Sequence, residues 1–224
     1  MIITIDGPAG SGKGTIAAAL AKKYKMAYFD TGMVYRAVGL QMVLNGNDLN
    51  DEKKAAEIAA NLTFPKMMAL SANKDFRSDV GSRAASIVSA YPQVRSALLA
   101  MQKNFANTPV FADGTPADGV IYDGRDTGTV ICPQADLKLY VIADLTIRAQ
   151  RRCRDLNNAG HKISFEQVFS DMKARDDRDQ NRSTAPLKPA PDAVTIDTSN
   201  FQLEDSLKVI IPLIDKKLAE LALK

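Results

Sequence analysis

The sequence predicts an α/β fold, built on a parallel five-stranded core sheet flanked by helices. Three observations support this expectation. Apolar runs of strand length alternate with longer stretches of helical periodicity along the chain, which is typical of a parallel sheet covered on both faces. The chain has 224 residues, 46% of them hydrophobic, enough for one α/β domain with appended elements. The first apolar run also leads through a glycine-rich turn directly into a helical stretch.

Five short runs are the expected strands. Each is rich in β-branched, aromatic or other apolar residues and is followed by turn-forming or polar residues, as buried strands usually are. In chain order they are "MIITID" at 1–6, "MAYFD" at 26–30, "GVIYD" at 119–123, "LKLYVIAD" at 137–144 and "DAVTID" at 192–197.

The stretches between these runs show helical periodicity. The expected helices cover residues 14–25, 31–46, 50–62, 80–105, 145–156, 164–182 and 203–223. Proline predicts a break or restart at Pro92 and a kink or restart at Pro212. Residues 63–79 predict short extended pieces at most, and "GRDTGTVICPQA" at 124–135 is expected to be turn-rich.

The bulk composition excludes several classes of protein. The net charge of +3 is too small to predict a nucleic-acid polymer as partner. No apolar run has the length of a membrane span, and no signal peptide is visible. The two cysteines, Cys132 and Cys153, lack metal-ligand spacing, so we expect reduced thiols in a cytoplasmic protein. The only histidine, His161, lies in a polar stretch that is typical of a loop, so we expect no catalytic role for it.

The turn "GPAGSGKGT" at residues 7–15 predicts a phosphate-binding loop. A strand before it and a helix after it give the motif its meaning, because backbone N–H groups and the helix N-terminus then form an anion cradle. The commoner pattern has Ser or Thr directly after the lysine, whereas here Gly14 follows Lys13. An incidental glycine-rich turn is the alternative. The expected nucleotide-binding residues are Gly7, Pro8, Ala9, Gly10, Ser11, Gly12, Lys13, Gly14 and Thr15.

A set of arginines lies near the ends of the predicted elements. Arg36 follows the second strand, and Arg125 follows the third. Ligands of doubly wound folds bind beyond the carboxyl ends of the strands, so these arginines are candidates for an anionic ligand. Three others are spaced by three and four residues and share one helix face: Arg175, Arg178 and Arg182. They either form ion pairs on a solvated helix or belong to a mobile lid that closes on a transferring phosphoryl group.

The run "VIYD" ends at Asp123 and looks like a Walker B element, in which an aspartate lies near the magnesium ion of the nucleotide. Magnesium keeps several waters and few protein ligands. The candidate protein contacts of Mg²⁺ are Asp123 and Thr15, and because the Thr15 hydroxyl comes one residue late, it contacts either the metal or only a phosphate.

Five motifs together resemble the bacterial cytidylate kinases in their order and spacing: "DGPAGSGKGT", "DTGMVYR", "YPQVR", "DGRDTGTV" and "RDDRDQNR". The first motif, with glycine after the lysine, is similar to the nucleoside monophosphate kinase branch of P-loop proteins. The other motifs are narrower, and the resemblance covers residues 2 to about 215. It implies a P-loop kinase fold and transfer of the γ-phosphoryl group of ATP to CMP, and to dCMP, in pyrimidine nucleotide metabolism.

The resemblance also implies roles for single residues. Lys13 would reach the outer phosphates of ATP. Arg36, Arg125 and Arg182 would grip the acceptor phosphate or the transferring group. The expected catalytic residues are Lys13, Arg125, Arg175 and Arg182.

The acceptor nucleoside has a further expected set. Arg175 and Asp179 would hold the sugar and close the lid. Ser86, Arg95 and Asp126 would read the base, because a carboxylate accepts from the N4 amino group of cytosine and would face O4 of uracil. The remaining acceptor residues of the resemblance are Thr31 and Tyr35; Tyr35 either lines the base pocket or is a core tyrosine.

The implied organisation has three parts. A core comprises 1–35, 107–155 and 184–224, an acceptor-binding insertion covers 36–106, and a short helical lid covers 156–183. We expect a monomer whose partners are small nucleotides. The sequence departs from the family's pattern at four places. Residues 62–78 are shorter than the corresponding part of the family's acceptor subdomain, and Arg77 is a weaker candidate for an acceptor-binding arginine there. Residues 106–119 resemble an inserted loop, and Thr127 stands where the family often has an apolar residue.

Three other functions remain alternatives. The nearest is another small-molecule kinase that prefers AMP, UMP or shikimate. A GTPase would need an N-K-x-D signature, but "NKDF" at 73–76 has Phe76 in place of the aspartate. A nucleotide-binding regulator without turnover is the third.

Overall fold

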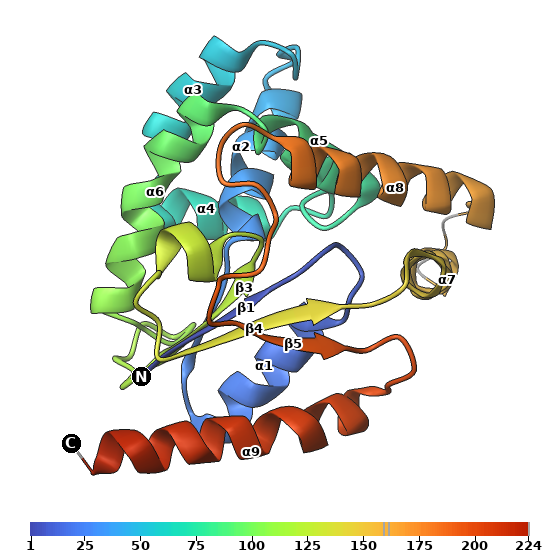
Figure 1. The fold of residues 1–224 in the computed structure, drawn as a ribbon. Helices are drawn as coiled ribbons and strands as arrows, with labels where there is room; N and C mark the ends of the chain where they lie inside the picture. Colours follow the sequence, from blue (N-terminus) through green and yellow to red (C-terminus); the bar gives the residue numbers. More distant parts are fainter. Residues whose placement is uncertain (159, 161, 224) are drawn as a thin grey trace. The chain divides into compact units, whose positions relative to one another are not determined.

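The computed structural model describes residues 1–158, 160 and 162–223, and it contains a five-stranded sheet (Figure 1). The strands are β1 (Ile2–Asp6), β2 (Ala27–Asp30), β3 (Val120–Gly124), β4 (Leu137–Ile142) and β5 (Val194–Asp197). Their order in the sheet is β2-β3-β1-β4-β5. β1 pairs in parallel with β3 and β4, and β4 pairs in parallel with β5. The predicted α/β class and five-stranded sheet are therefore confirmed.

The chain divides into two compact units. The first comprises Met1–Phe29, Thr108–Asn181 and Ala185–Lys224, and the second comprises Asp30–Asn107 with Arg182–Thr184. The first unit thus contains most of the segment that we predicted as a lid, and the second contains the predicted insertion. The three-part division itself stays a prediction.

The first unit is built around the central strand β1. Ile3 and Ile5 are fully buried and pack in one core with Ile16 and Leu20 from α1 (Lys13–Tyr24). α9 (Leu203–Ala222) contributes to the same core and lies beside α1 on one face of the sheet (Figure 1). The remaining helices of this unit are α7 (Leu145–Asn158) and α8 (Phe165–Asn181), which pack against each other, and the short π-helical turn η1 (Thr127–Ile131).

The second unit is helical and contains α2 (Gly32–Leu44), α3 (Glu52–Ala60), α4 (Phe64–Ser71), α5 (Asp79–Val88) and α6 (Pro92–Asn107). Its close packing shows at Gly39 of α2, where a Cβ would lie 2.7 Å from the backbone carbon of Ala84 in α5. The break predicted at Pro92 is confirmed, because α5 ends at Val88 and α6 begins at Pro92.

One expectation about local structure was wrong, and another was wrong in part. Residues 63–79 contain the helix α4, which starts after Thr63, whose side chain accepts from the N–H of Lys66. α9 runs through Pro212 without a restart, and Ile210 and Ile214 on either side are fully buried. Packing of an apolar face can therefore keep a helix continuous despite one missing N–H donor. The segment 124–135 is turn-rich as expected, because it contains bends, turns and the short π-helical turn η1.

Within the described part of the chain, none of the helices is both long and apolar enough to cross a membrane.

Candidate active site

The phosphate-binding loop occupies residues 7–15, between β1 and α1. Gly10 and Gly12 have φ angles of 74° and 86°, a left-handed conformation that favours glycine. Gly12 is also the residue immediately before α1. The loop therefore has the strand–turn–helix geometry in which a helix N-terminus attracts an anion.

Two carbonyl groups of the loop are held from outside. Thr198 Oγ1 donates to the carbonyl of Ser11 at 2.9 Å, and Arg148 Nη1 donates to the carbonyl of Ala9 at 3.0 Å. Ser11 Oγ is buried and has no hydrogen-bond partner among the described residues. The loop is thus fixed in shape and keeps a polar atom that a bound phosphate or water could satisfy.

Lys13 and Asp123 lie together beside this loop. Lys13 Nζ is 3.7 Å from Asp123 Oδ1, and the hydroxyl of Tyr28 donates to Asp123 Oδ2 at 3.2 Å. A Cβ on Gly14 would lie 2.9 Å from the same Oδ2 atom. The carboxylate at the end of β3 is therefore packed against the first turn of α1, where Thr15 is exposed.

A second cluster joins the end of β3 to α8. Arg125 Nε donates to Asp179 Oδ2 at 2.9 Å, and Arg175 Nε is 4.0 Å from the same oxygen. Burial acts to lower the pKa of Arg125, but the carboxylates of Asp179, Asp123 and Asp176 together outweigh it, and the pKa is raised. The structure thus brings together three of the predicted site residues in the first unit.

Asp126 follows directly and is also buried, with 3% of its surface exposed. Its carbonyl accepts from the N–H groups of Val130 and Ile131, which closes the π-helical turn. The next two residues, Thr127 and Gly128, donate to the carboxylate of Asp6. The predicted base-reading carboxylate therefore starts a tightly bonded turn.

The other predicted acceptor residues belong to the second unit. Thr31 is the residue before α2, and Arg36 Nη1 donates to Asp30 Oδ2 at 3.4 Å. The guanidinium of Arg95 lies 5.2 Å from the ring centroid of Tyr35, and its Nη1 donates to the carbonyl of Ser89.

Ser86 is buried on α5, and Arg182 belongs to the short segment grouped with this unit. Asp126 lies in the first unit, so its convergence with Ser86 and Arg95 stays a prediction. The weaker candidate Arg77 has a side chain that is 66% exposed and lies 3.9 Å from Asp30 Oδ2.

Sequence reasoning missed several participants. Asp6, Tyr28 and Arg148 received no role, although each contacts the phosphate-binding loop or a predicted site segment. A signal was available only for Asp6, a carboxylate at the end of a strand just before the glycine-rich turn. Tyr28 contacts Asp123, which is 95 residues away in the chain. Arg148 contacts Asp176 and Ala9 of the site segments, which are 28 and 139 residues away.

Two further observations concern other kinds of site. His161 lies outside the described residues. Within the described ranges, no three His, Cys, Asp or Glu side chains gather in a group that could hold a metal ion.

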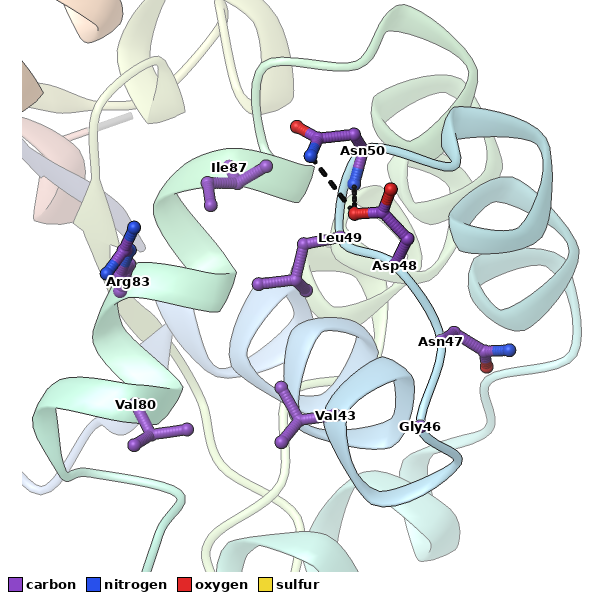
Figure 2. Close-up of a pocket in the computed structure, with 9 residues that line it drawn as sticks. All are labelled: Val43, Gly46, Asn47, Asp48, Leu49, Asn50, Val80, Arg83 and Ile87. Carbon is purple, nitrogen blue, oxygen red and sulfur yellow. Dashed lines mark hydrogen bonds between the residues drawn. The ribbon is translucent and has the colours of Figure 1, made fainter.

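A groove of about 540 Å³ lies in the second unit, between the end of α2, the loop that follows it and α5 (Figure 2). Val43, Leu49 and Ile87 form its apolar part, and Arg83 lies at one side of it. It contains none of the predicted site residues.

Comparison with known proteins points to one family. The family model described as cytidylate kinase matches residues 3–216. The chain is 46% identical over 218 residues to a cytidylate kinase of Bradyrhizobium sp. (strain ORS 278), with 96% of each chain covered. It is 44% identical over 217 residues to a cytidylate kinase of Rhodospirillum rubrum, covering 97% of this chain and 98% of the relative. A solved structure from Eubacterium ventriosum, titled as an uncharacterized protein, matches with a TM-score of 0.52 at 15% identity. The match covers 96% of this chain and 98% of the other chain, and it shows likeness of fold alone.

Proposed function

The chain belongs to the cytidylate kinase family, and on that premise we propose that it transfers the γ-phosphoryl group of ATP to CMP, giving ADP and CDP. The near-full-length identity to relatives of one name is the observation that carries this proposal. The site chemistry agrees with it, because a phosphate-binding loop, a lysine and a cluster of arginines are what phosphoryl transfer requires. The second acceptor that we propose is dCMP.

The donor site is the loop at residues 7–15. The N-terminus of α1 and the loop N–H groups would hold the phosphates of ATP, and Lys13 would reach its outer phosphates. The fixed carbonyls of Ala9 and Ser11 support a preformed loop. A preformed cradle binds without a large ordering cost.

The residues present fit a magnesium ion that is held mainly by phosphates and water. Such an ion takes one or two carboxylates from the protein, and Asp123 lies against the first turn of α1, in a space that a Cβ on Gly14 would fill. We assign Asp123 and Thr15 as its protein contacts. When bound, the ion would neutralise charge on the transferring group.

The acceptor phosphate and the transferring group are assigned to arginines. Arg125 and Arg175 share the carboxylate of Asp179, so their guanidinium groups are already oriented near the end of β3. Arg36 and Arg182 complete the set. A phosphate oxygen of CMP is already an anion, so these cations position and neutralise rather than remove a proton.

The base is assigned to Ser86, Arg95 and Asp126, with Tyr35 lining the pocket and Thr31 beside it. Cytosine presents an N4 donor next to acceptors, and the carboxylate of Asp126 can accept from N4. Uracil would place O4 against that carboxylate, and a site that leaves buried polar groups unpaired rejects the wrong base strongly.

We propose that the helical segment 156–183 acts as a lid and that residues 36–106 bind the acceptor. Closure of both would exclude water, which otherwise competes for the phosphoryl group. We further propose that the enzyme works as a monomer in the cytoplasm, which gel filtration and cell fractionation can check.

The experiment that tests the function is a coupled assay with ATP and a panel of acceptors: CMP, dCMP, UMP, AMP and shikimate. We expect kcat/KM to be highest for CMP. Preference for UMP, AMP or shikimate would contradict the proposal. A protein that binds ATP and CMP without turnover would instead be a nucleotide-binding regulator, the third alternative function.

The same panel tests the base reader. Asp126→Ala should lower the CMP-over-UMP ratio of kcat/KM by about 10- to 100-fold, because the lost hydrogen bond serves only cytosine. Affinity for ATP should change little. Asp113→Ala is the matched control, since Asp113 is an exposed carboxylate that accepts from Thr115 in the preceding loop. An unchanged ratio in Asp126→Ala would exclude Asp126 from base selection.

A further inference from the structure

The carboxylate of Asp6 connects the phosphate-binding loop to the turn after β3. Asp6 is the last residue of β1 and directly precedes Gly7, where the loop begins. Its Oδ1 atom accepts from the N–H and the hydroxyl of Thr127, at 2.9 and 2.8 Å. Its Oδ2 atom accepts from the N–H of Gly128 at 2.8 Å. One side chain thus makes three bonds to a segment more than 120 residues away.

The turn depends on these bonds because of how it is built. Only 4% of the surface of Asp6 is exposed, and Thr127 is fully buried. The N–H groups of Thr127 and Gly128 lie at the start of the π-helical turn, where helical structure supplies no partner for them. Without Asp6, two buried N–H groups would lose their acceptors.

Packing leaves the turn little room to settle elsewhere. A Cβ on Gly128 would lie 2.8 Å from Thr4 Oγ1 in β1 and 3.2 Å from the Lys138 side chain in β4. The turn therefore lies directly on the central strands. Its position is set by close backbone approach and by the Asp6 carboxylate together.

The residues immediately before this turn are Arg125 and Asp126, which we assign to the acceptor phosphate and base. We infer that Asp6 is a positioning residue for acceptor recognition: its buried carboxylate fixes the Asp126–Thr127–Gly128 backbone to the strand that leads into the phosphate-binding loop. Selection of the acceptor base then depends on a side chain that touches no part of the acceptor. This inference rests on the proposed function.

The test compares Asp6→Asn, Thr127→Val and a matched control. Asparagine keeps one acceptor oxygen but presents its NH₂ group to a backbone N–H, so one bond is replaced by a donor–donor contact. Thr127→Val removes only the hydrogen bond of the hydroxyl. It keeps the inference testable if Asp6→Asn does not fold. The control is Asp136→Asn, because Asp136 Oδ2 accepts from the N–H of Ile2 at 2.7 Å, at the opposite end of the same strand.

Calorimetric titrations with CMP, UMP and ATP supply the readout. For Asp6→Asn we expect the ratio of CMP affinity to UMP affinity to fall by at least about tenfold, because a site that loses a discriminating polar contact loses selectivity. The affinity for ATP should stay within about threefold of the wild-type value. Thr127→Val should lower the ratio by about threefold, the effect of one hydrogen bond. Asp136→Asn should leave the ratio at the wild-type value.

A purely structural role predicts a different pattern. Asp6→Asn and Asp136→Asn would then lower the midpoint of thermal unfolding and the active fraction, with the CMP-over-UMP ratio unchanged in both. That pattern would overturn the inference, and so would a tenfold or larger loss of ATP affinity in Asp6→Asn that exceeds the loss of CMP affinity.

The inference and the proposed function fail separately. A wild-type enzyme that phosphorylates CMP, together with an unchanged affinity ratio in Asp6→Asn, overturns only the role of Asp6. A wild-type protein that binds CMP without transferring phosphate to it overturns the proposed function, while a lowered ratio in Asp6→Asn still supports the positioning role.

Discussion

Gly14 shows how one missing side chain shapes the site. The commoner phosphate-binding loop has Ser or Thr after its lysine, whereas this chain has glycine. The structure gives a steric reason, because a Cβ at residue 14 would lie 2.9 Å from Asp123 Oδ2 and 3.7 Å from the Tyr28 hydroxyl. The glycine therefore admits the carboxylate to the first turn of α1, a reason that no inspection of the loop sequence alone could supply.

Gly14→Ala should displace the Asp123 carboxylate. We expect kcat to fall by about tenfold, less than the roughly 100- to 1000-fold loss when a charge-stabilising contact is removed outright, because the carboxylate is displaced and not removed. The magnesium concentration needed for half-maximal activity should rise as well. A magnesium titration of activity, combined with calorimetric binding of ATP without metal, measures both effects. An unchanged magnesium requirement would show that Asp123 does not act through the metal.

Asp6 makes stability depend on pH in an unusual direction. Burial raises its pKa from 3.8 to about 6, while the hydrogen bonds from Gly128 and Thr127 act against the rise and the charge of Asp126 adds to it. The folded state therefore binds this proton more tightly than the unfolded state. The resulting stabilisation is fully present below the unfolded pKa and is lost as the pH rises through about 6.

Asp6→Asn cannot titrate at this position and isolates the effect. The measured quantity is the free energy of unfolding of the wild type minus that of Asp6→Asn. This difference should be about 2 kcal/mol smaller at about pH 7.5 than at about pH 4.5, because each unit of pKa shift corresponds to about 1.36 kcal/mol. Urea titrations of both proteins across this range measure the difference. A difference that stays constant with pH would show that the pKa of Asp6 is not raised.

At the scale of elements, α8 is held by carboxylates on its buried side. Sequence spacing predicted that Arg175, Arg178 and Arg182 share one helix face, either with ion pairs on a solvated helix or as part of a lid. α8 ends at Asn181, so Arg182 lies beyond the helix. The structure buries Asp176 and Asp179 and leaves Arg178 exposed. The helix was thus predictable from its periodicity, but its inward face was not, since the buried partners of these carboxylates come from distant segments.

Asp176 has such a partner in Arg148 of α7. Arg148 Nη2 donates to Asp176 Oδ2 at 2.7 Å, and the same guanidinium donates to the carbonyls of Ala143 and Ala9. The side chains of Arg148 and Asp176 are only 6% and 11% exposed. This ion pair therefore joins α8 to the phosphate-binding loop through one buried cation.

Asp176→Ala should leave the charge of Arg148 buried without its carboxylate. We expect a loss of about 3–5 kcal/mol in the free energy of unfolding, as for other broken buried pairs. Urea denaturation measures it. The double variant Arg148→Met with Asp176→Leu is the control and should be clearly more stable than Asp176→Ala, because no unpaired charge remains. Equal losses in both would mean that packing, not charge, determines the effect.

At the scale of the whole molecule, the sequence predicted the five strands and the parallel class because both depend on local patterns. The strand order β2-β3-β1-β4-β5 depends on contacts between distant segments. The bonds from Asp6 to Thr127 and from Arg125 to Asp179 are of this kind. The predicted site residues were identified by motif, while the residues that hold them in place were not.

The strand order has a consequence for synthesis on the ribosome. β1 is made first, yet it lies between β3 and β4, and its earliest partner begins at Val120. At roughly 5–20 residues per second, β1 waits on the order of ten seconds for that partner to be translated. The contiguous helical segment 30–107 emerges during this interval. We therefore expect the helical unit to become compact on the nascent chain first, and the sheet to close around β1 only afterwards.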